Sequence, residues 1–190
     1  EVNDTYGHDT GDLLLREVST RLNALGRFSE TFYRLGGDEF AFLSSGLTET
    51  AAVSRAREIS DSISKPYTIN NQLIKIATCV GIVLSDNERR SDYLYKFADL
   101  ALYEAKKEGS QQIKVFRQRM LQKLQESRTL ENDMARAIEN DEFVVYYQPI
   151  VNSVSKEIYG YEALIRWMHP VKGVLSPDSF IFAAEKTGMI

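Results

Sequence analysis

Two adjacent glycines followed by two carboxylates form the densest group of potentially reactive residues in the sequence. They are Gly36, Gly37, Asp38 and Glu39. Because glycines carry no side chains, a phosphate can approach their main-chain N–H groups closely. Carboxylate oxygens beside a phosphate are suitable ligands for Mg²⁺. The four residues therefore indicate a metal and phosphate site, although an acidic hairpin turn explains them equally well when they are taken alone.

A second pair of charged residues lies far along the chain, in a run that predicts a strand. Glu162 and Arg166 are four residues apart, so both side chains lie on one face of an extended strand. The carboxylate could ligate a metal while the guanidinium pairs with a phosphate. Spacing alone favours a simpler interpretation, a salt bridge on the same face or across strands.

Three motifs at characteristic spacing surround the glycine pair. They read Asn3-Asp4-x-x-Gly7-His8-x-x-Gly11-Asp12, Arg34-Leu35-Gly36-Gly37-Asp38-Glu39-Phe40 and Ala98-Asp99-x-Ala101-Leu102-Tyr103-x-Ala105-Lys106. Residues 1–116 closely resemble the GGDEF family of diguanylate cyclases, which condense two GTP molecules to cyclic di-GMP.

The resemblance implies substrate-binding roles for five residues. Asn3 and Asp12 would bind the guanine edge, Gly36 and Gly37 would line the phosphate site, and Lys106 would neutralise phosphate charge. Structural interpretations remain open for some of them. Asp12 could be a first-turn helix carboxylate favoured by the helix dipole, Asn3 a turn residue, and Lys106 a solvated lysine.

The resemblance also implies catalytic and metal-binding roles for Asp38 and Glu39. Asp38 would ligate Mg²⁺ or Mn²⁺ and help to activate a ribose 3′-hydroxyl, and Glu39 would support metal binding or proton handling. The metal would stabilise charge on the transferring phosphoryl group. Since each such domain holds one GTP, the reaction requires a homodimer.

The sequence departs from the GGDEF pattern in three places. A further metal-binding aspartate of the family would precede residue 1. Ser110-Gln111 stands where the family usually has Arg-Asn, which puts GTP affinity and turnover in doubt. At the position of the family's inhibitory Arg-x-x-Asp motif, this sequence has Arg27-Phe28-Ser29-Glu30, with glutamate in place of the aspartate. We interpret that site as degenerate, with product inhibition weakened or lost.

A second resemblance covers residues 130–190, which are similar to the start of the EAL family of cyclic-di-GMP phosphodiesterases. It implies that Glu162 is a metal ligand, that Arg166 contacts the ligand phosphate, and that Gln148 and Leu164 lie in the cyclic-di-GMP groove. EAL domains are β/α barrels, and a barrel of this type takes ~250 residues. Only its first strands and helices are expected here, so we expect no hydrolysis by these residues alone.

Turn residues and apolar spacing predict the elements that position these groups. The expected elements are helices at 9–25 (capped by Asp9-Thr10), 48–64 and 91–109, hairpins of 31–35 with 39–44 and of 67–69 with 73–84, and a strand at 112–116. This order predicts an α+β fold in which helices cover an antiparallel-rich sheet. The resemblance implies a nucleotide-cyclase-palm-like arrangement.

The remaining sequence predicts a connector and a second domain. Residues 117–140 are polar and helix-favouring, which indicates a semi-rigid helical connector. Strands are expected at 143–147 and 157–167, then a loop, and a helix opened by Ser176-Pro177. We therefore divide the chain into 1–116, 117–140 and 141–190, and expect both domains to be truncated.

Composition narrows the class of partner and the location. A net charge of −4 argues against a nucleic-acid-binding surface. The lone Cys79 fits a reducing compartment, so we expect a cytoplasmic protein. No apolar run reaches the ~20 residues that span a bilayer, and any membrane attachment would come through segments outside this sequence.

These observations favour a cyclic-di-GMP signalling enzyme with a cyclase domain followed by a phosphodiesterase domain. Two alternatives stay open. The first domain could bind GTP weakly or without turnover and regulate the second. Alternatively, both domains could be degenerate and act as a cyclic-di-GMP receptor.

Overall fold

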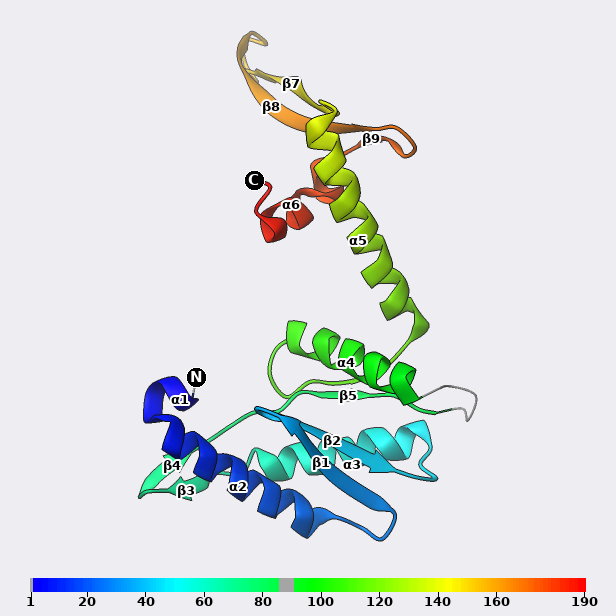
Figure 1. Cartoon of the computed structure of the whole chain (residues 1–190). Coiled ribbons are helices and arrows are strands. Elements are labelled where there is room, and N and C mark those ends of the chain that lie inside the picture. Colours follow the sequence, from blue (N-terminus) through cyan, green and yellow to red (C-terminus); the bar gives the residue numbers. More distant parts are fainter. Residues whose placement is uncertain (1, 86–90) are drawn as a thin grey trace. The chain divides into compact units, whose positions relative to one another are not determined.

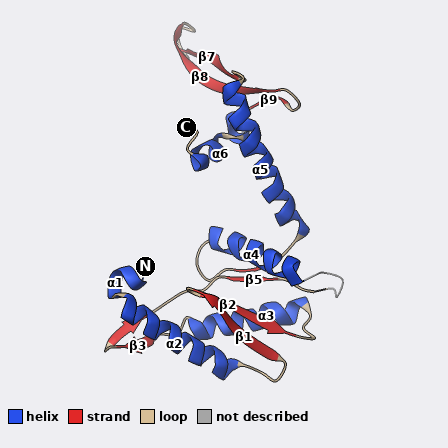
Figure 2. Cartoon of the chain, viewed as in Figure 1, coloured by secondary structure: helices blue, strands red, loops and turns tan. Residues whose placement is uncertain are grey.

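The computed structural model describes residues 2–85 and 91–190. The chain forms two compact units, one up to Met120 and the other from Leu121 (Figure 1). In both, helices are combined with small β-sheets (Figure 2). No helix in the described ranges is both long enough and apolar enough to cross a membrane.

The helices of the first unit are α1 (Val2–Tyr6), α2 (His8–Leu25), α3 (Glu49–Ile63) and α4 (Ser91–Lys107). Three of them were predicted, but α1 was not. The expected Asp9-Thr10 cap is wrong, because both residues lie inside α2. Gly7 precedes the helix instead, and its φ of 84° separates α1 from α2. Thr48 caps α3 by accepting a hydrogen bond from Ala51 N.

The strands of the first unit form three separate pairs. They are β1 (Glu30–Gly36) with β2 (Glu39–Ser44), β3 (Tyr67–Ile69) with β4 (Gln72–Ile74), and β5 (Val80–Ile82) with β6 (Ile113–Val115). The first two pairs are antiparallel hairpins, as predicted. A continuous strand over 73–84 was wrong. The chain leaves the second hairpin after Ile74, and β5 pairs in parallel with β6.

The apolar stripe of α2 packs against α3 and the second hairpin. Leu14, Val18 and Leu22, spaced at helical intervals, face this core. Its buried members are Leu14, Val18, Leu22, Ile63, Tyr67, Ile69 and Ile74. These three residues therefore pack α2 against the hairpin β3–β4.

Helix α4 lies very close to strand β5. A methyl group on Gly81 would be 2.2 Å from Ala98 O and 2.3 Å from Leu102 N. The neighbouring helix face is made of small residues, and Ala101 and Ala105 are completely buried. This contact joins α4 to the parallel pair β5–β6.

The second unit contains a three-stranded antiparallel sheet and two helices. Its elements are α5 (Gln118–Glu139), which begins just before the unit boundary, β7 (Phe143–Val151), β8 (Ile158–His169), β9 (Gly173–Leu175), the 3₁₀ turn η1 (Pro177–Ser179) and α6 (Ile181–Thr187). The predicted loop after Trp167 instead holds the end of β8 and all of β9. Ser176-Pro177 opens only η1, and α6 follows it.

Trp167 is the centre of the second core. It is fully buried, and its Nε1 donates to Glu142 Oε2 at 2.9 Å. Phe143 and Phe180 pack on its ring, with ring centroids 5.4 and 5.7 Å from it. Met134 and Ala137 of α5 and Ala184 of α6 are its other buried members, so this core packs both helices against the sheet.

We predict that Gly81→Ala destabilises the first unit by about 1–3 kcal/mol, because backbone atoms of α4 occupy the space of the new methyl group. Gly160→Ala is the matched control, since its nearest neighbour is a side-chain atom at 4.0 Å. Urea denaturation should separate the two variants. Equal stability would contradict the close packing of α4 on β5.

Candidate active site

The Gly36–Glu39 group forms the exposed tip of the hairpin β1–β2. Register is regular up to Arg34↔Phe40 and then shifts to Gly36↔Glu39. Gly37 has a φ of 51°, a left-handed conformation that favours glycine. A methyl group on either glycine would meet nothing within 4 Å. The backbone at the tip is therefore open to a ligand, and Asp38 and Glu39 are exposed beside it.

Arg34 holds the tip in this conformation. Its Nε and Nη2 donate to Gly37 O at 3.1 and 2.9 Å. Because the guanidinium is rigid and donates two hydrogen bonds to one carbonyl, it restricts the conformation of the turn that carries Asp38 and Glu39. Sequence reasoning assigned Arg34 no role, although an arginine directly before a glycine turn is a usable signal for such a bond.

Asn3 and Asp12 come from two different helices. Asn3 lies on α1 and Asp12 in the first turns of α2, and both are exposed. The carboxamide of Asn3 lies against Gly11, the residue directly before Asp12. The fold therefore brings these two predicted residues to neighbouring positions, nine residues apart in sequence.

Lys106 is exposed near the C-terminal end of α4. In the described part of the chain, no hydrogen bond or ion pair connects it to the glycine tip. The segment that follows is a tight turn in which Gln111 has a φ of 60°. The Cys79 thiol is half-buried and donates to Gly109 O at 3.2 Å.

Asp38 and Glu39 are suited to a metal that is bound partly by its substrate. Within residues 2–85 and 91–190, no three His, Cys, Asp or Glu side chains come together to hold an ion. Mg²⁺, however, usually takes one or two carboxylates together with substrate phosphates and water. The two carboxylates at the tip match that requirement in number and kind.

The second set of predicted residues lies on one face of the hairpin β7–β8. Gln148 pairs directly with Glu162 across the strands, and Leu164 and Arg166 follow at alternate positions of β8. No ion pair joins Glu162 to Arg166 in the described ranges. The Arg166 guanidinium instead lies 5.8 Å from the centre of the Tyr146 ring. The structure therefore does not contain the simple salt bridge between them.

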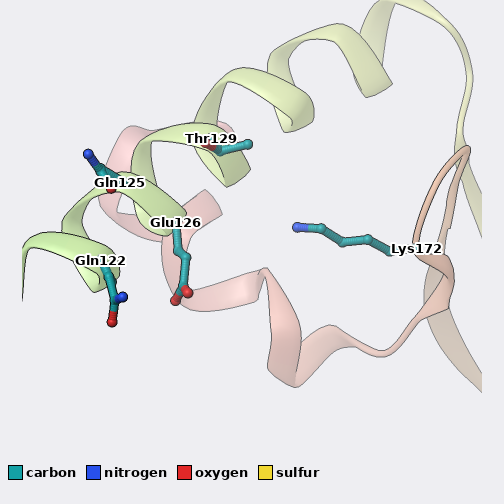
Figure 3. Close-up of a pocket in the computed structure, with 5 residues that line it drawn as sticks. All are labelled: Gln122, Gln125, Glu126, Thr129 and Lys172. Carbon is teal, nitrogen blue, oxygen red and sulfur yellow. The ribbon is translucent and has the colours of Figure 1, made fainter. Parts of the chain in front are cut away.

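Two shallow pockets lie elsewhere in the second unit. The first, about 300 Å³, lies between α5 and Lys172, whose side chain reaches toward Glu126 and Thr129 (Figure 3). The second, about 420 Å³, includes Asp133 and His169. Neither is lined by a predicted site residue, so the candidate sites are open surfaces of hairpins and helices.

Two family models match the chain. The model "Diguanylate cyclase, GGDEF domain" matches residues 1–112, which is more than half of the chain. The chain belongs to the GGDEF family. The model "EAL domain" matches residues 131–190, so the GGDEF sequence is followed by the beginning of an EAL sequence.

Two curated relatives carry the names of cyclic-di-GMP enzymes. The chain is 39% identical over 191 residues to "Bifunctional diguanylate cyclase/cyclic di-GMP phosphodiesterase MucR" of Pseudomonas aeruginosa. It is 36% identical over 191 residues to "Cyclic di-GMP phosphodiesterase PdeR" of Escherichia coli. Both alignments cover 100% of this chain but only 28% and 29% of the relatives. The chain thus spans less than a third of their length.

A solved structure agrees with the fold of the GGDEF unit. The GGDEF domain of TpbB (YfiN) from Pseudomonas aeruginosa superposes with a TM-score of 0.60 at 30% identity. The match covers 65% of this chain and 74% of that domain. The predicted α+β architecture of the first unit is confirmed by this likeness.

Arg27 and Glu30, the predicted degenerate inhibitory pair of the GGDEF unit, have different environments. Arg27 is exposed and pairs with Glu58 at 2.8 Å. The Glu30 side chain is only 3% exposed, and it binds Arg55 through both oxygens, at 2.9 and 2.6 Å. Because the Glu30 carboxylate is already bound, it is not available to a ligand beside Arg27. Reduced product inhibition stays a prediction.

We predict that Glu30→Gln lowers the unfolding free energy at pH 7 by about 3 kcal/mol, because Arg55 loses its buried partner. Hydrogen bonds from Arg55 hold the pKa of Glu30 below its ordinary value of 4.5. A lowered pKa means that the ion pair stabilises the fold above pH 4.5 and that this stabilisation is lost as the pH falls through the lowered value. The difference between wild type and variant should therefore shrink under acid conditions.

Glu49→Gln is the matched control, since Glu49 also pairs with an arginine, Arg117. Both side chains of that pair are more than a third exposed. Its loss should change the unfolding free energy little, because both charges stay solvated. Urea titrations between pH 3 and pH 7 compare the two. A Glu30→Gln variant no less stable than Glu49→Gln would show that the buried pair contributes little.

Proposed function

We propose that the chain is part of a longer cyclic-di-GMP signalling protein. Residues 1–116 would form its diguanylate cyclase domain, 117–140 a helical connector and 141–190 the beginning of its phosphodiesterase domain. The main support is the open tip of β1–β2, where an unshielded glycine turn and two exposed carboxylates lie together in a chain of the GGDEF family.

In the proposed reaction, the 3′-hydroxyl of one GTP attacks the α-phosphate of another. A new P–O bond forms, the bond to pyrophosphate breaks, and the hydroxyl proton is transferred to a base. The 3′-hydroxyl of the second nucleotide then attacks the α-phosphate of the first in the same way. This second attack closes the ring and releases a second pyrophosphate. Asp38 and Glu39 would hold Mg²⁺ or Mn²⁺, which supplies positive charge at the phosphates when bound. Asp38 would also orient the attacking hydroxyl.

Binding of each GTP would use groups from three parts of the domain. Asn3 and Asp12 would hydrogen-bond the guanine edge, since a carboxylate accepts from its N1–H and N2–H donors. Gly36 and Gly37 would offer backbone N–H groups to the phosphates, and Lys106 would add a positive charge. Because one domain binds one GTP, we propose a homodimer with the two tips facing each other.

For the second unit, we propose a cyclic-di-GMP groove on the face of β7–β8 that carries Gln148, Glu162, Leu164 and Arg166. Glu162 would ligate a metal, and Arg166 would pair with a phosphate of the ligand. The direct cross-strand pairing of Gln148 with Glu162 supports a common surface. Residues outside this chain would be needed for hydrolysis.

A second candidate function is regulation, in which the GGDEF domain binds GTP without turning it over and controls the phosphodiesterase. Ser110-Gln111 favours this version, because neither residue carries the positive charge that the family's arginine offers to a phosphate. We place both versions in the cytoplasm, where GTP is available. Any membrane attachment would use segments outside this sequence.

We predict that the full-length protein converts GTP to cyclic di-GMP in the presence of Mg²⁺, as measured by chromatography of nucleotides. Asp38→Ala should reduce synthesis at least about 100-fold, on the scale of losing one group that stabilises the transition state, and leave hydrolysis of cyclic di-GMP intact. Glu162→Gln is the reciprocal control and should affect hydrolysis alone. Loss of both activities in either variant would contradict separate sites.

The regulatory version makes a different prediction for the same protein. Calorimetry would detect GTP binding, while no cyclic di-GMP would form. GTP would then change the rate of hydrolysis in the wild type but not in Lys106→Ala, which lacks a phosphate-binding charge. If GTP neither binds nor reacts, both versions are wrong.

A further inference from the structure

Gly11 gives the Asn3 side chain the space that it occupies. A methyl group on Gly11 would lie 1.8 Å from Asn3 Oδ1, 3.0 Å from Asn3 Cγ and 3.6 Å from Asn3 Nδ2. These are the three nearest heavy atoms, and all belong to one carboxamide. Gly11 is buried, while Asn3 is exposed. The carboxamide thus covers the glycine and keeps its other side in contact with solvent.

The backbone around this contact limits where Asn3 can go. Gly7 N donates to Asn3 O at 2.9 Å, and Gly11 N donates to Gly7 O at 3.2 Å. Gly7 itself has a φ of 84°, which fixes the turn between the two helices. Asn3 is therefore tied to the start of α2 by its main chain, and only its side chain is left to adjust.

A glycine in this position is unfavourable for the helix by itself. Replacing alanine with glycine inside a helix costs about 1 kcal/mol, and Gly11 has an ordinary helical backbone that alanine would adopt without strain. No local backbone requirement explains the glycine. The glycine is explained by the space that it leaves for the Asn3 side chain.

We infer that Gly11 is a positioning residue for base recognition, which orients the Asn3 carboxamide beside Asp12 so that both face the guanine edge. This inference rests on the proposed GTP-binding function. A carboxamide offers a donor and an acceptor, and a carboxylate offers acceptors alone. The carboxamide can donate to the O6 acceptor of guanine while the carboxylate accepts from the adjacent N1–H and N2–H donors. Adenine has an acceptor at N1 and no donor at C2, so it does not fit this pair.

A double-mutant cycle in the 190-residue chain tests, without any nucleotide, whether Gly11 makes room for the Asn3 side chain. Gly11→Ala alone should lower the thermal midpoint, because Asn3 must leave its position. In an Asn3→Ala background the same change should raise the midpoint by about 4 °C, since the methyl group now fits and alanine favours the helix. Thr20→Ala, at an exposed position of α2, is the control and should behave alike in both backgrounds.

Nucleotide binding by the full-length protein tests the recognition step. Gly11→Ala should weaken GTP binding about tenfold, the loss expected when one hydrogen bond to the base is misplaced. Weak ATP binding should not change, because the phosphate contacts come from other elements. Asn3→Ala should show the same loss, and the double variant should lose no more.

Different outcomes separate the packing of Asn3 on Gly11 from its role in guanine recognition. If Gly11→Ala lowers the midpoint equally with and without Asn3, the glycine has a structural role only and the inference is wrong. Equal losses for GTP and ATP would lead to the same conclusion. If the wild-type protein binds no GTP, the proposed function and the recognition role both fail, while the thermal cycle still decides whether Gly11 makes room for Asn3.

Discussion

The buried Arg55 guanidinium is the point at which the elements of the GGDEF unit are joined. It projects from α3, donates to Leu25 O at the end of α2 and binds the Glu30 carboxylate at the beginning of β1. Its Nη1 also lies 2.8 Å from Glu58. A charge removed from water must be paired and hydrogen-bonded, so these elements have to meet here. Since β1 leads directly to the glycine tip, this interaction also fixes the base of the proposed active site.

The tip itself depends on shorter-range constraints. Gly37 adopts a left-handed backbone that most residues avoid, and Arg34 binds its carbonyl with two donors. Neither contact involves Asp38 or Glu39, and no hydrogen bond or ion pair with another described residue occupies their carboxylates. The site thus combines a rigid backbone with unengaged carboxylates, an arrangement suited to a metal that arrives with its substrate.

The proposed selection of guanine involves a different part of the unit. The proposed guanine contacts lie on α1 and α2, whereas the proposed metal ligands lie on β1–β2. A loss of base recognition can therefore be separated from a loss of chemistry. In the second unit, by contrast, all the proposed ligand contacts lie on one face of β7–β8. The core around Trp167 supports this sheet near the C-terminal end of β8.

The sequence by itself determined the family, through its three spaced motifs. It also determined the α+β class of the first unit and the hairpin around Gly36-Gly37, because these depend on local periodicity and on turn residues. The common strand of Glu162 and Arg166 was also predictable, since alternation is a local rule. Tertiary structure decided the parallel pairing of β5 with β6, which joins segments about thirty residues apart. It also decided that Glu30 binds Arg55 and that Asn3 lies on Gly11. Those contacts depend on how helices and strands pack together, and residue spacing along the chain carries no information about that packing.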